Sequence, residues 1–359
     1  MFASQFLLPA VSVLALLASA CGNDSQSANP TPQAPRIAGV RELGTVAMPP
    51  NVIGRDGGFS GIVNGRLLWT FGDTFYNPSA ADGSGFRSNT AALADLSNPL
   101  AATEPLDSAG APWPFLAFTP QEQRYNDSTG KPDERYALWT GSIIPDGERG
   151  ALVFYEKLKV HAGTLNYEAI GCGIARMSRD TTFAVRDTAL LFTTPEPMLT
   201  LATVAGDTVY MYGGKNDGTP YAPVVIARVA RSQIDRRSAY RFWDGGGWVE
   251  DYRRAAVILG FIPGDVSISW NPWLKSWLAV HSGFFANTIQ MRTAPSPQGP
   301  WSDPVTMFTG ADPAAGSNDY AGKEQPHLAA EGGRRISVTY HQPTGFLSGR
   351  IHLVEVVFN

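Results

Sequence analysis

The sequence predicts an all-β protein, and more specifically a five-bladed β-propeller, from three observations. Short apolar runs recur along the 359 residues and are separated by Gly, Pro, Asn and Asp, which is the pattern of strands and turns. The chain has 37 glycines and 27 prolines, and long helical periodicity is nearly absent. The apolar runs also fall into five repeats that share one internal order.

Each predicted repeat contains a first strand, a tight turn, an aromatic or β-branched second strand, a loop and a third strand. In the first repeat these strands are residues 58–63, 67–71 and 90–94. The later repeats are expected at 138–177, 198–229, 266–293 and 327–358, the last with its first strand at 327–330. One small sheet cannot bury both of its faces, so radial stacking of five sheets is the expected architecture.

Two alternatives to this architecture stay open from the sequence. The same strands could form a two-sheet sandwich. Residues 233–256 could form a helix, although the Asp-Gly-Gly-Gly run at 244–247 opposes it.

The composition and charge of the chain disfavour one class of binding partner. Apolar residues make up 43% of the chain and charged residues 17%, which is a globular composition. The formal net charge is −4 and no Lys/Arg-rich block occurs. We therefore expect no nucleic-acid partner, and neutral substrates stay open.

The N-terminus predicts export and lipid attachment. Residues 6–20 form an apolar run that ends in small residues before Cys21, as in a signal peptide followed by a bacterial lipobox. We expect a signal peptide at 1–20, a lipidated Cys21 with a disordered tether to residue 36, and the propeller at 37–359. An ordinary secretory signal stays open, because no Lys or Arg precedes the run and Ala18 stands where lipoboxes prefer Leu.

A lipidated Cys21 would hold the protein in the bacterial cell envelope through a membrane anchor. Gly22, rather than Asp, follows the cysteine, so the outer membrane is the expected location in a Gram-negative cell. The only other cysteine, Cys172, is expected to be a buried thiol. No metal or cofactor is expected, because the five histidines lack a zinc-binding spacing and no phosphate-cradling loop occurs.

Two aspartates stand out because a single hairpin carries both of them. Asp56 precedes the first strand of the first repeat, and Asp73 follows the second strand. Since the strands are antiparallel, the start of one and the end of the other lie at the same edge. Two carboxylates facing one pocket are the machinery of most glycoside hydrolases. A structural role stays open, because Asp next to Gly is also a common turn residue.

Other polar and aromatic residues are expected near the mouths of the first strands, where they could bind substrate. Aromatic rings among them can stack on sugars or fill the core, and the charged ones can also be solvated strand ends, turns or surface loops. Asp265 precedes the fourth repeat much as Asp56 precedes the first. The predicted substrate-binding residues are Arg55, Phe75, Tyr76, Trp139, Ser142, Glu156, Lys215, Trp270, Glu324 and His327.

The sequence resembles a known family in several blocks. The Arg-Asp-Gly-Gly-Phe-Ser-Gly block at 55–61 and the Leu-Trp-Thr-Phe-Gly-Asp-Thr-Phe block at 68–75 are similar to the hallmark of the domain of unknown function 4185 family. Further blocks at 138–142, 153–157, 267–272, 292–294 and 299–302 agree with it. The resemblance covers roughly residues 40 to 359, and its most specific piece is Phe-Gly-Asp-Thr at 71–74.

This resemblance implies a function. The family is placed in glycoside hydrolase family 183, whose characterised members resemble endo-acting D-arabinanases with a five-bladed propeller fold. Those enzymes use two aspartates for catalysis, and the matching positions in this sequence are Asp56 and Asp73. An inverting mechanism is implied, with carboxyls about 6.5–9.5 Å apart. Because aromatic residues flank Asp73, we expect it to be the acid and Asp56 the base. A non-catalytic glycan-binding lipoprotein and a scaffolding propeller are the alternatives.

Overall fold

The computed structural model describes residues 35–129, 131, 133–163, 166–216, 222–260, 262 and 265–359. The predicted signal peptide and Cys21 lie outside these residues. Residues 35–359 form one unit that consists mainly of β-sheets. The predicted all-β class is therefore confirmed.

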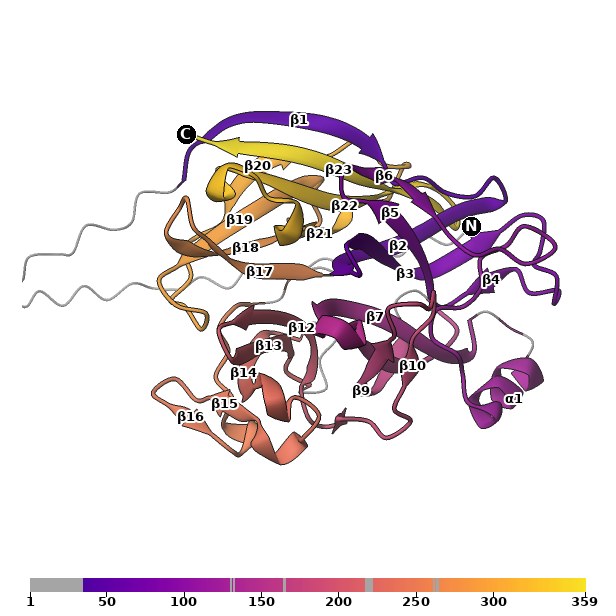
Figure 1. Cartoon of the computed structure of the whole chain (residues 1–359), viewed down its shortest axis with the longest axis horizontal. Helices are drawn as coiled ribbons and strands as arrows, with labels where there is room; N and C mark the ends of the chain where they lie inside the picture. The colour runs from indigo at the N-terminus through magenta and orange to yellow at the C-terminus, as the bar shows by residue number, and fades with distance from the viewer. Residues whose placement is uncertain are drawn as a thin grey trace, which may run out of the picture. The chain divides into compact units, whose positions relative to one another are not determined.

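The largest sheet has nine strands and joins the two ends of the described chain. Its order is β21-β22-β23-β2-β3-β5-β6, with β1 on β23 and β4 on β3. The link between its two halves is one parallel bridge, Gly54 to Gly349. Figure 1 shows β1 lying along β23. The strands are β1 (Ile37–Thr45), β2 (Val52–Val63), β3 (Arg66–Tyr76), β4 (Phe86–Arg87), β5 (Thr90–Asp95), β6 (Asn98–Thr103), β21 (Tyr320–Glu324), β22 (Arg335–Gly345) and β23 (Ser348–Phe358).

Three smaller sheets contain the remaining strands, and each begins with an antiparallel meander. The second sheet is β7 (Arg135–Pro145), β8 (Ala151–Val160), β9 (Tyr167–Met177), β10 (Val185–Arg186) and β11 (Phe192–Thr193). The third is β12 (Met198–Ala205), β13 (Thr208–Gly214), β14 (Val224–Ala230), β15 (Arg241–Trp243) and β16 (Trp248–Val249). The fourth is β17 (Val266–Asn271), β18 (Ser276–Ser282), β19 (Thr288–Ala294) and β20 (Val305–Thr309).

We call the sets of strands that begin with β2, β7, β12, β17 and β21 the five strand groups. The first strand of each group contacts the first strand of the next. β2 contacts β7, β7 contacts β12, β12 contacts β17, β17 contacts β21, and β21 contacts β2. The apolar core fills the spaces between neighbouring groups. One cluster joins β3 to β23 through Leu67, Trp69 and Leu353, and another joins the second and third sheets through Phe154, Leu199 and Met211. Cys172 is buried in that second cluster.

The predicted number of five blades is not confirmed by the hydrogen bonding. The described residues form four sheets rather than five, and none of them closes on itself. More than two sheets also argue against the two-sheet sandwich.

One local prediction was wrong, and one alternative left open by the sequence is excluded. The fifth repeat begins with β21 at Tyr320–Glu324, whereas residues 326–328 form the 3-10 turn η5, since Pro326 at its first position lacks a backbone N–H for a strand ladder. Residues 233–256 form short strands and 3-10 turns instead of one helix. The 3-10 turns are η1 (Gly147–Arg149), η2 (Arg231–Gln233), η3 (Arg237–Ala239), η4 (Tyr252–Arg254), η5 (Pro326–Leu328) and η6 (Glu331–Gly333).

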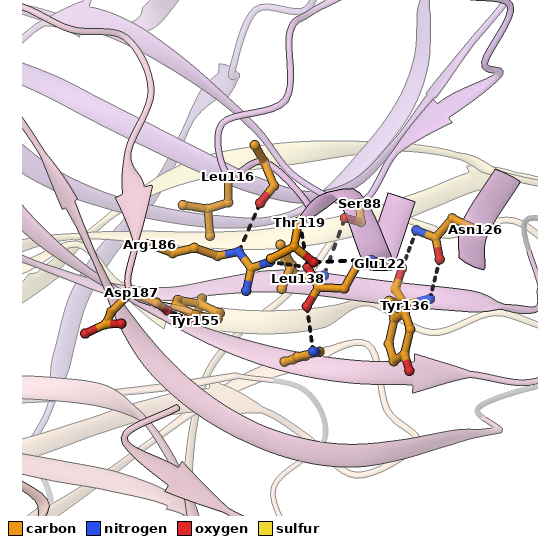
Figure 2. A network of polar contacts seen from close by, with 12 residues as sticks. Ser88, Leu116, Thr119, Glu122, Asn126, Tyr136, Leu138, Tyr155, Arg186 and Asp187 are labelled. Carbon is orange, nitrogen blue, oxygen red and sulfur yellow. Dashed lines mark hydrogen bonds and ion pairs between the residues drawn. The ribbon is translucent and has the colours of Figure 1, made fainter. Parts of the chain in front are cut away.

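One α-helix, α1 (Pro120–Thr129), lies between β6 and β7. Its start is a capping box, in which the Thr119 amide donates to Glu122 Oε2 at 2.8 Å and the Glu122 amide donates to Thr119 Oγ1 at 3.2 Å. Figure 2 shows the same Glu122 carboxylate against Arg186, which comes from β10. Lys157 of β8 completes the ion-pair cluster at 2.5 Å. The helix is thereby fastened to the second sheet. In the described part of the chain, no helix has the length and apolarity needed to cross a membrane.

Candidate active site

The pairing of β2 with β3 is irregular where the two predicted aspartates lie. Arg55 pairs with Thr74 and Gly57 pairs with Phe71, so Asp56 alone stands opposite both Gly72 and Asp73. Such a β-bulge changes the direction in which side chains leave the strand. It places Asp56 Oδ1 so close to Gly72 that a Cβ atom there would lie 2.4 Å from it.

A second irregularity follows on β2, and glycine makes it possible. Gly57 and Gly58 both have φ of 82°, a region that residues with a Cβ rarely adopt. The glycines of both the Asp-Gly-Gly and the Gly-Asp block therefore have a structural role. Gly57 and Gly58 allow the positive φ angles on β2, and Gly72 allows the close approach of the Asp56 carboxyl to β3. Together they fix the backbone that carries Asp56 and Asp73.

Asp56 and Asp73 line one cavity of about 250 Å³. The structure thus brings the two predicted catalytic residues together. The opposite wall comes from the far end of the chain, where β21, β22 and β23 meet β2. The other lining residues are Gly54, Arg55, Phe75, Tyr320, His341, Pro343, Gly345, Leu347, Ser348 and Gly349.

The Asp73 carboxylate is held by a cation and an indole from β7. Arg135 Nη2 donates to Asp73 Oδ2 at 2.5 Å, and Trp139 Nε1 donates to Asp73 Oδ1 at 3.1 Å. Burial raises the pKa of Asp73 above its ordinary value, and the Arg135 charge and both hydrogen bonds oppose that rise. Both oxygens therefore have partners that favour the ionised form.

The Asp56 carboxyl has a different environment. The Tyr320 hydroxyl donates to Asp56 Oδ2 at 2.9 Å, and no ion pair to Asp56 occurs within the described residues. Burial and the nearby charge of Asp73 raise the pKa of Asp56 to about 7. At neutral pH this carboxyl exists in both its protonated and ionised forms.

A buried lysine supports the backbone next to Asp56. Lys323 Nζ donates to the carbonyls of Gly57 at 2.7 Å and Ala321 at 2.9 Å, and pairs with Asp265 at 2.8 Å. These contacts tie β21 and the start of β17 to the glycine bulge of β2. Asp265, which the sequence places before a first strand like Asp56, thus reaches the same end of the sheets.

Several predicted substrate-binding residues lie at or beside the cavity. Phe75 lines it, and Trp139 contacts Asp73. Glu156 stands opposite Trp139 in the β7–β8 pairing and accepts a hydrogen bond from Thr200 at 3.2 Å. Burial raises the pKa of Glu156 to about 7.

Arg55 borders the cavity, but its guanidinium is not available to a substrate. Its Nη1 donates to the buried Glu104 at 2.7 Å, and the group stacks on the ring of Phe71 at 3.5 Å. Arg55 Nη2 also donates to the Ala47 carbonyl at 2.5 Å. The role of Arg55 is to fasten β2 to the residues after β6, which differs from the predicted role.

Other predicted residues serve structure away from the cavity. The Tyr76 hydroxyl donates to the Pro112 carbonyl, Ser142 Oγ accepts from the Ala202 amide, and Lys215 Nζ donates to the Ala255 carbonyl. Trp270 lies one residue before the end of β17, at the end opposite Asp265. None of these side chains lines the cavity, so the structure does not support their predicted contact with a substrate there.

Glu324 is buried at the end of β21, and His327 is half-buried in the turn η5 that follows. Ser269 Oγ donates to Glu324 Oε2 at 2.6 Å, and His327 Nε2 lies 2.8 Å from Ser60 Oγ. Burial raises the pKa of Glu324 to about 7 and lowers the pKa of His327 to about 4. Neither residue lines the cavity.

Sequence reasoning missed the residues that complete the site from β21 and β22. Tyr320 and His341 are paired across these strands, and their ring centroids are 4.5 Å apart. His341 Nδ1 is buried and has no hydrogen-bond partner in the described part of the chain. The sequence signal was slight: His341 directly follows the strand-like run at 336–340. Nothing in the spacing links either residue to Asp56.

No cluster of three or more His, Cys, Asp or Glu side chains suited to a metal ion occurs among the described residues. The cavity offers instead two carboxyl groups with different partners, one tyrosine hydroxyl and an apolar wall. This arrangement can bind a polyhydroxylated ligand and exchange protons with it.

The fold is shared with solved hydrolases. A protein from Bacteroides ovatus ATCC 8483, provisionally described as a hydrolase, is 17% identical, with a TM-score of 0.60 and coverage of 86% of this chain and 87% of that one. An exo-β-1,3-galactanase from Phanerochaete chrysosporium is 12% identical, with a TM-score of 0.54 and coverage of 87% and 64%. The RS223 β-xylosidase is 10% identical, with a TM-score of 0.50 and coverage of 87% and 94%. The chain therefore has a propeller-like all-β fold that also occurs in glycoside hydrolases.

The sequence model of the family described as "Domain of unknown function (DUF4185)" matches residues 177–343. The family resemblance expected from the sequence is thus confirmed over this range. The match covers Asp265 and Tyr320 but not Asp56 or Asp73. A search of curated proteins finds no match to the sequence.

Proposed function

We propose that the protein is a glycoside hydrolase in which Asp56 and Asp73 are the catalytic carboxyl groups. The observation that carries this proposal is the shared cavity, in which the two carboxyls have different partners. Glycosidases need one carboxyl that can donate a proton and one that stays ionised.

The partners of the two groups assign their roles. Asp56 is the general acid, because its pKa of about 7 leaves it protonated in a large fraction of molecules at neutral pH. Asp73 is the general base, because Arg135 and Trp139 stabilise its ionised form. This is the reverse of the assignment made from the sequence, where the aromatic neighbours of Asp73 favoured it as the acid.

In the proposed reaction, the Asp56 carboxyl protonates the glycosidic oxygen as the bond to the anomeric carbon breaks. Asp73 accepts a proton from the water that attacks the opposite face of the sugar, which inverts the anomeric configuration. Tyr320 orients Asp56 and donates to the carboxylate that remains after the proton has left. Arg135 and Trp139 keep Asp73 directed into the cavity.

We interpret the strand groups as five blades. The nine-stranded sheet is two of them, joined at the Gly54–Gly349 bridge. The ring of contacts among β2, β7, β12, β17 and β21 supports this interpretation, because inner strands of a propeller surround a common axis. Asp56 on β2 and Asp265 before β17 then lie at the same end of that axis.

For the substrate, we propose a D-arabinofuranosyl linkage in an arabinan of the arabinogalactan or lipoarabinomannan type. The support is the resemblance to the family and the fold shared with enzymes described as a galactanase and a xylosidase. We further propose that the protein is a secreted monomer anchored in the bacterial envelope through Cys21, where a cell-wall glycan is within reach.

The proposal is tested by incubating the purified protein with D-arabinan, arabinogalactan and a panel of other polysaccharides. Chromatography of the products should show arabinose-containing oligosaccharides from the first two, with inverted anomers visible by NMR at early times. Binding without any product would favour the alternative of a non-catalytic glycan-binding protein, and would refute the hydrolase.

A further inference from the structure

The tip of the β22–β23 hairpin forms part of the cavity wall. β22 ends at Gly345 and β23 begins at Ser348, and these two residues pair, so Phe346 and Leu347 are the turn. Gly345, Leu347 and Ser348 line the cavity. Phe346 lies between two lining residues, at the rim.

This tip is fixed relative to the catalytic pair by backbone packing. A Cβ atom at Gly54 would lie 2.6 Å from the Leu347 oxygen and from Ser348 Cα. Gly54 is two residues before Asp56 on β2, so the contact ties the position of Phe346 to that of the proposed acid. A ligand contact made by Phe346 would therefore be held at a set distance from the cavity.

Two unfavourable features coincide at the tip. Phe346 is 92% exposed, although water contact with an aromatic ring is unfavourable. Leu347 has φ of 55°, a left-handed conformation that favours glycine over branched residues. Local strain of this kind gathers at ligand-binding sites in proteins. Single exposed apolar residues are common, but here the exposure and the strain adjoin a cavity that already holds two carboxyls.

The loop between β18 and β19 also combines an exposed phenylalanine with a positive φ angle. Phe285 is 71% exposed and has φ of 46°. The loop reaches the β21 side of the cavity, because Asn287 Oδ1 accepts from the amide of Asp319, the neighbour of Tyr320. Two loops from different strand groups thus present phenylalanine rings to solvent near the cavity.

The cavity volume sets how much of a glycan it can hold. A volume of about 250 Å³ is below the roughly 300–1,000 Å³ of pockets that enclose a drug-sized ligand, so the cavity holds one sugar residue rather than an oligosaccharide. Further residues of a longer glycan must lie outside, across the rim. A sugar ring has one face of C–H groups, which packs against an aromatic ring through apolar contact.

We propose that the Phe346 turn is a second sugar-binding subsite, where the ring stacks on the sugar residue next to the one in the cavity. This inference rests on the proposed function and deepens it. The subsite favours oligosaccharides and polysaccharides over single glycosides. It selects by the apolar face of a neutral sugar rather than by charge.

The test compares binding of arabinose and of longer arabino-oligosaccharides by calorimetry, with the full-length protein carrying Asp56→Asn to prevent turnover. Adding Phe346→Ala should weaken binding of the longer oligosaccharides about tenfold and leave the arabinose affinity unchanged. Phe346→Trp should restore the oligosaccharide affinity. Phe183→Ala is the matched control, because Phe183 is 51% exposed but lies outside the cavity wall; it should have no effect.

Equal oligosaccharide affinity with and without Phe346→Ala would overturn the inference, as would equal losses for arabinose and oligosaccharide. A change in sedimentation with Phe346→Ala, without a change in affinity, would show a contact between copies of the chain and would also overturn it. If the wild-type protein binds glycans but cleaves none, the proposed function fails while the binding series still decides the subsite. If nothing on the panel binds, both fail.

Discussion

Asp56 and Asp73 lie in one cavity, yet Arg135 pairs with Asp73 and a tyrosine hydroxyl is the hydrogen-bonding partner of Asp56. The two side chains come from the same hairpin, separated by a bulge in which Asp56 faces two residues of β3. A single local irregularity therefore creates two different electrostatic environments. The predictions that follow use this asymmetry and the contacts that maintain it.

The activity should fall as the pH rises above about 7. Asp56 must be protonated to act as the acid, and burial and the charge of Asp73 raise its pKa to about 7. Proton loss at higher pH removes the catalytic form. The profile of kcat/KM against pH, which reports ionisations of the free enzyme, should show this descending limb. A flat profile from about pH 6 to 9 would contradict the role of Asp56.

Tyr320→Phe should move that descending limb to higher pH. The Tyr320 hydroxyl donates to Asp56 and favours its ionised form, so its removal makes the proton harder to lose. We expect kcat to decrease as well, since the carboxyl loses an orienting contact. Tyr125→Phe on α1, outside the cavity lining, is the control and should leave the profile unchanged. A limb that moves to lower pH in Tyr320→Phe would refute this link.

Gly72→Ala should reduce activity far more than stability. A methyl group at this position would lie 2.4 Å from Asp56 Oδ1, so the carboxyl must rotate away from Tyr320. The moving atom belongs to a side chain, which limits the cost to folding. We expect kcat to fall by at least about tenfold, because misplacing a catalytic group by a fraction of an ångström is costly. Gly85→Ala, with open space at its Cβ, should retain wild-type activity.

Glu324→Gln should stabilise the protein at high pH and have little effect near pH 4. Burial raises the pKa of Glu324 to about 7, above its value in an unfolded chain. The folded state then binds the proton more tightly, so the contribution of this group to stability is lost as pH rises through about 7. At pH 8 we expect a gain of roughly 2 kcal/mol in the free energy of unfolding.

Urea unfolding at several pH values measures this effect. Glu168→Gln, at an exposed carboxyl, is the control and should show no such gain. If the free energies of unfolding of Glu324→Gln and the wild type differ by the same amount at pH 5 and pH 8, the raised pKa of Glu324 is not the cause of the difference.

Glu122→Gln should destabilise the fold without changing the chemistry of the cavity. Glu122 pairs with the buried Arg186 and with Lys157, and removal of its charge leaves Arg186 without an anionic partner. Breaking a buried ion pair costs about 3 kcal/mol. The free energy of unfolding in urea should fall by that amount, whereas Arg124→Ala on the exposed face of α1 should be neutral. Unchanged stability in Glu122→Gln would show that α1 is held by other contacts.

The sequence predicted the all-β class because strand and turn signals are local. It also predicted that Asp56 and Asp73 lie at one edge, because the two strands between them are joined by a tight turn. Their position in one cavity follows from that hairpin and from the bulge at Gly72, which the sequence does not reveal.

The other half of the site depends on contacts between distant parts of the chain. Tyr320 and His341 reach Asp56 through the pairing of β21 with β22 and the bridge between Gly54 and Gly349. The buried ion pair between Arg55 and Glu104 is equally non-local. The sequence therefore could not show that Arg55 has a structural role, and its charge suggested substrate binding instead. The prediction for Trp270 differs from the structure for another reason. The sequence indicated the strand at 266–270, but not that its start, next to Asp265, is the end nearer the cavity.

The most direct test of the account is the rate of oligosaccharide release from D-arabinan by Asp56→Asn and by Asp73→Asn, each compared with the wild type. Both substitutions preserve side-chain size, and cooperative thermal unfolding checks that each variant is folded. We predict that each lowers kcat by about a thousandfold. Wild-type release by either folded variant would contradict the claim that the two carboxyls in this cavity carry out the hydrolysis.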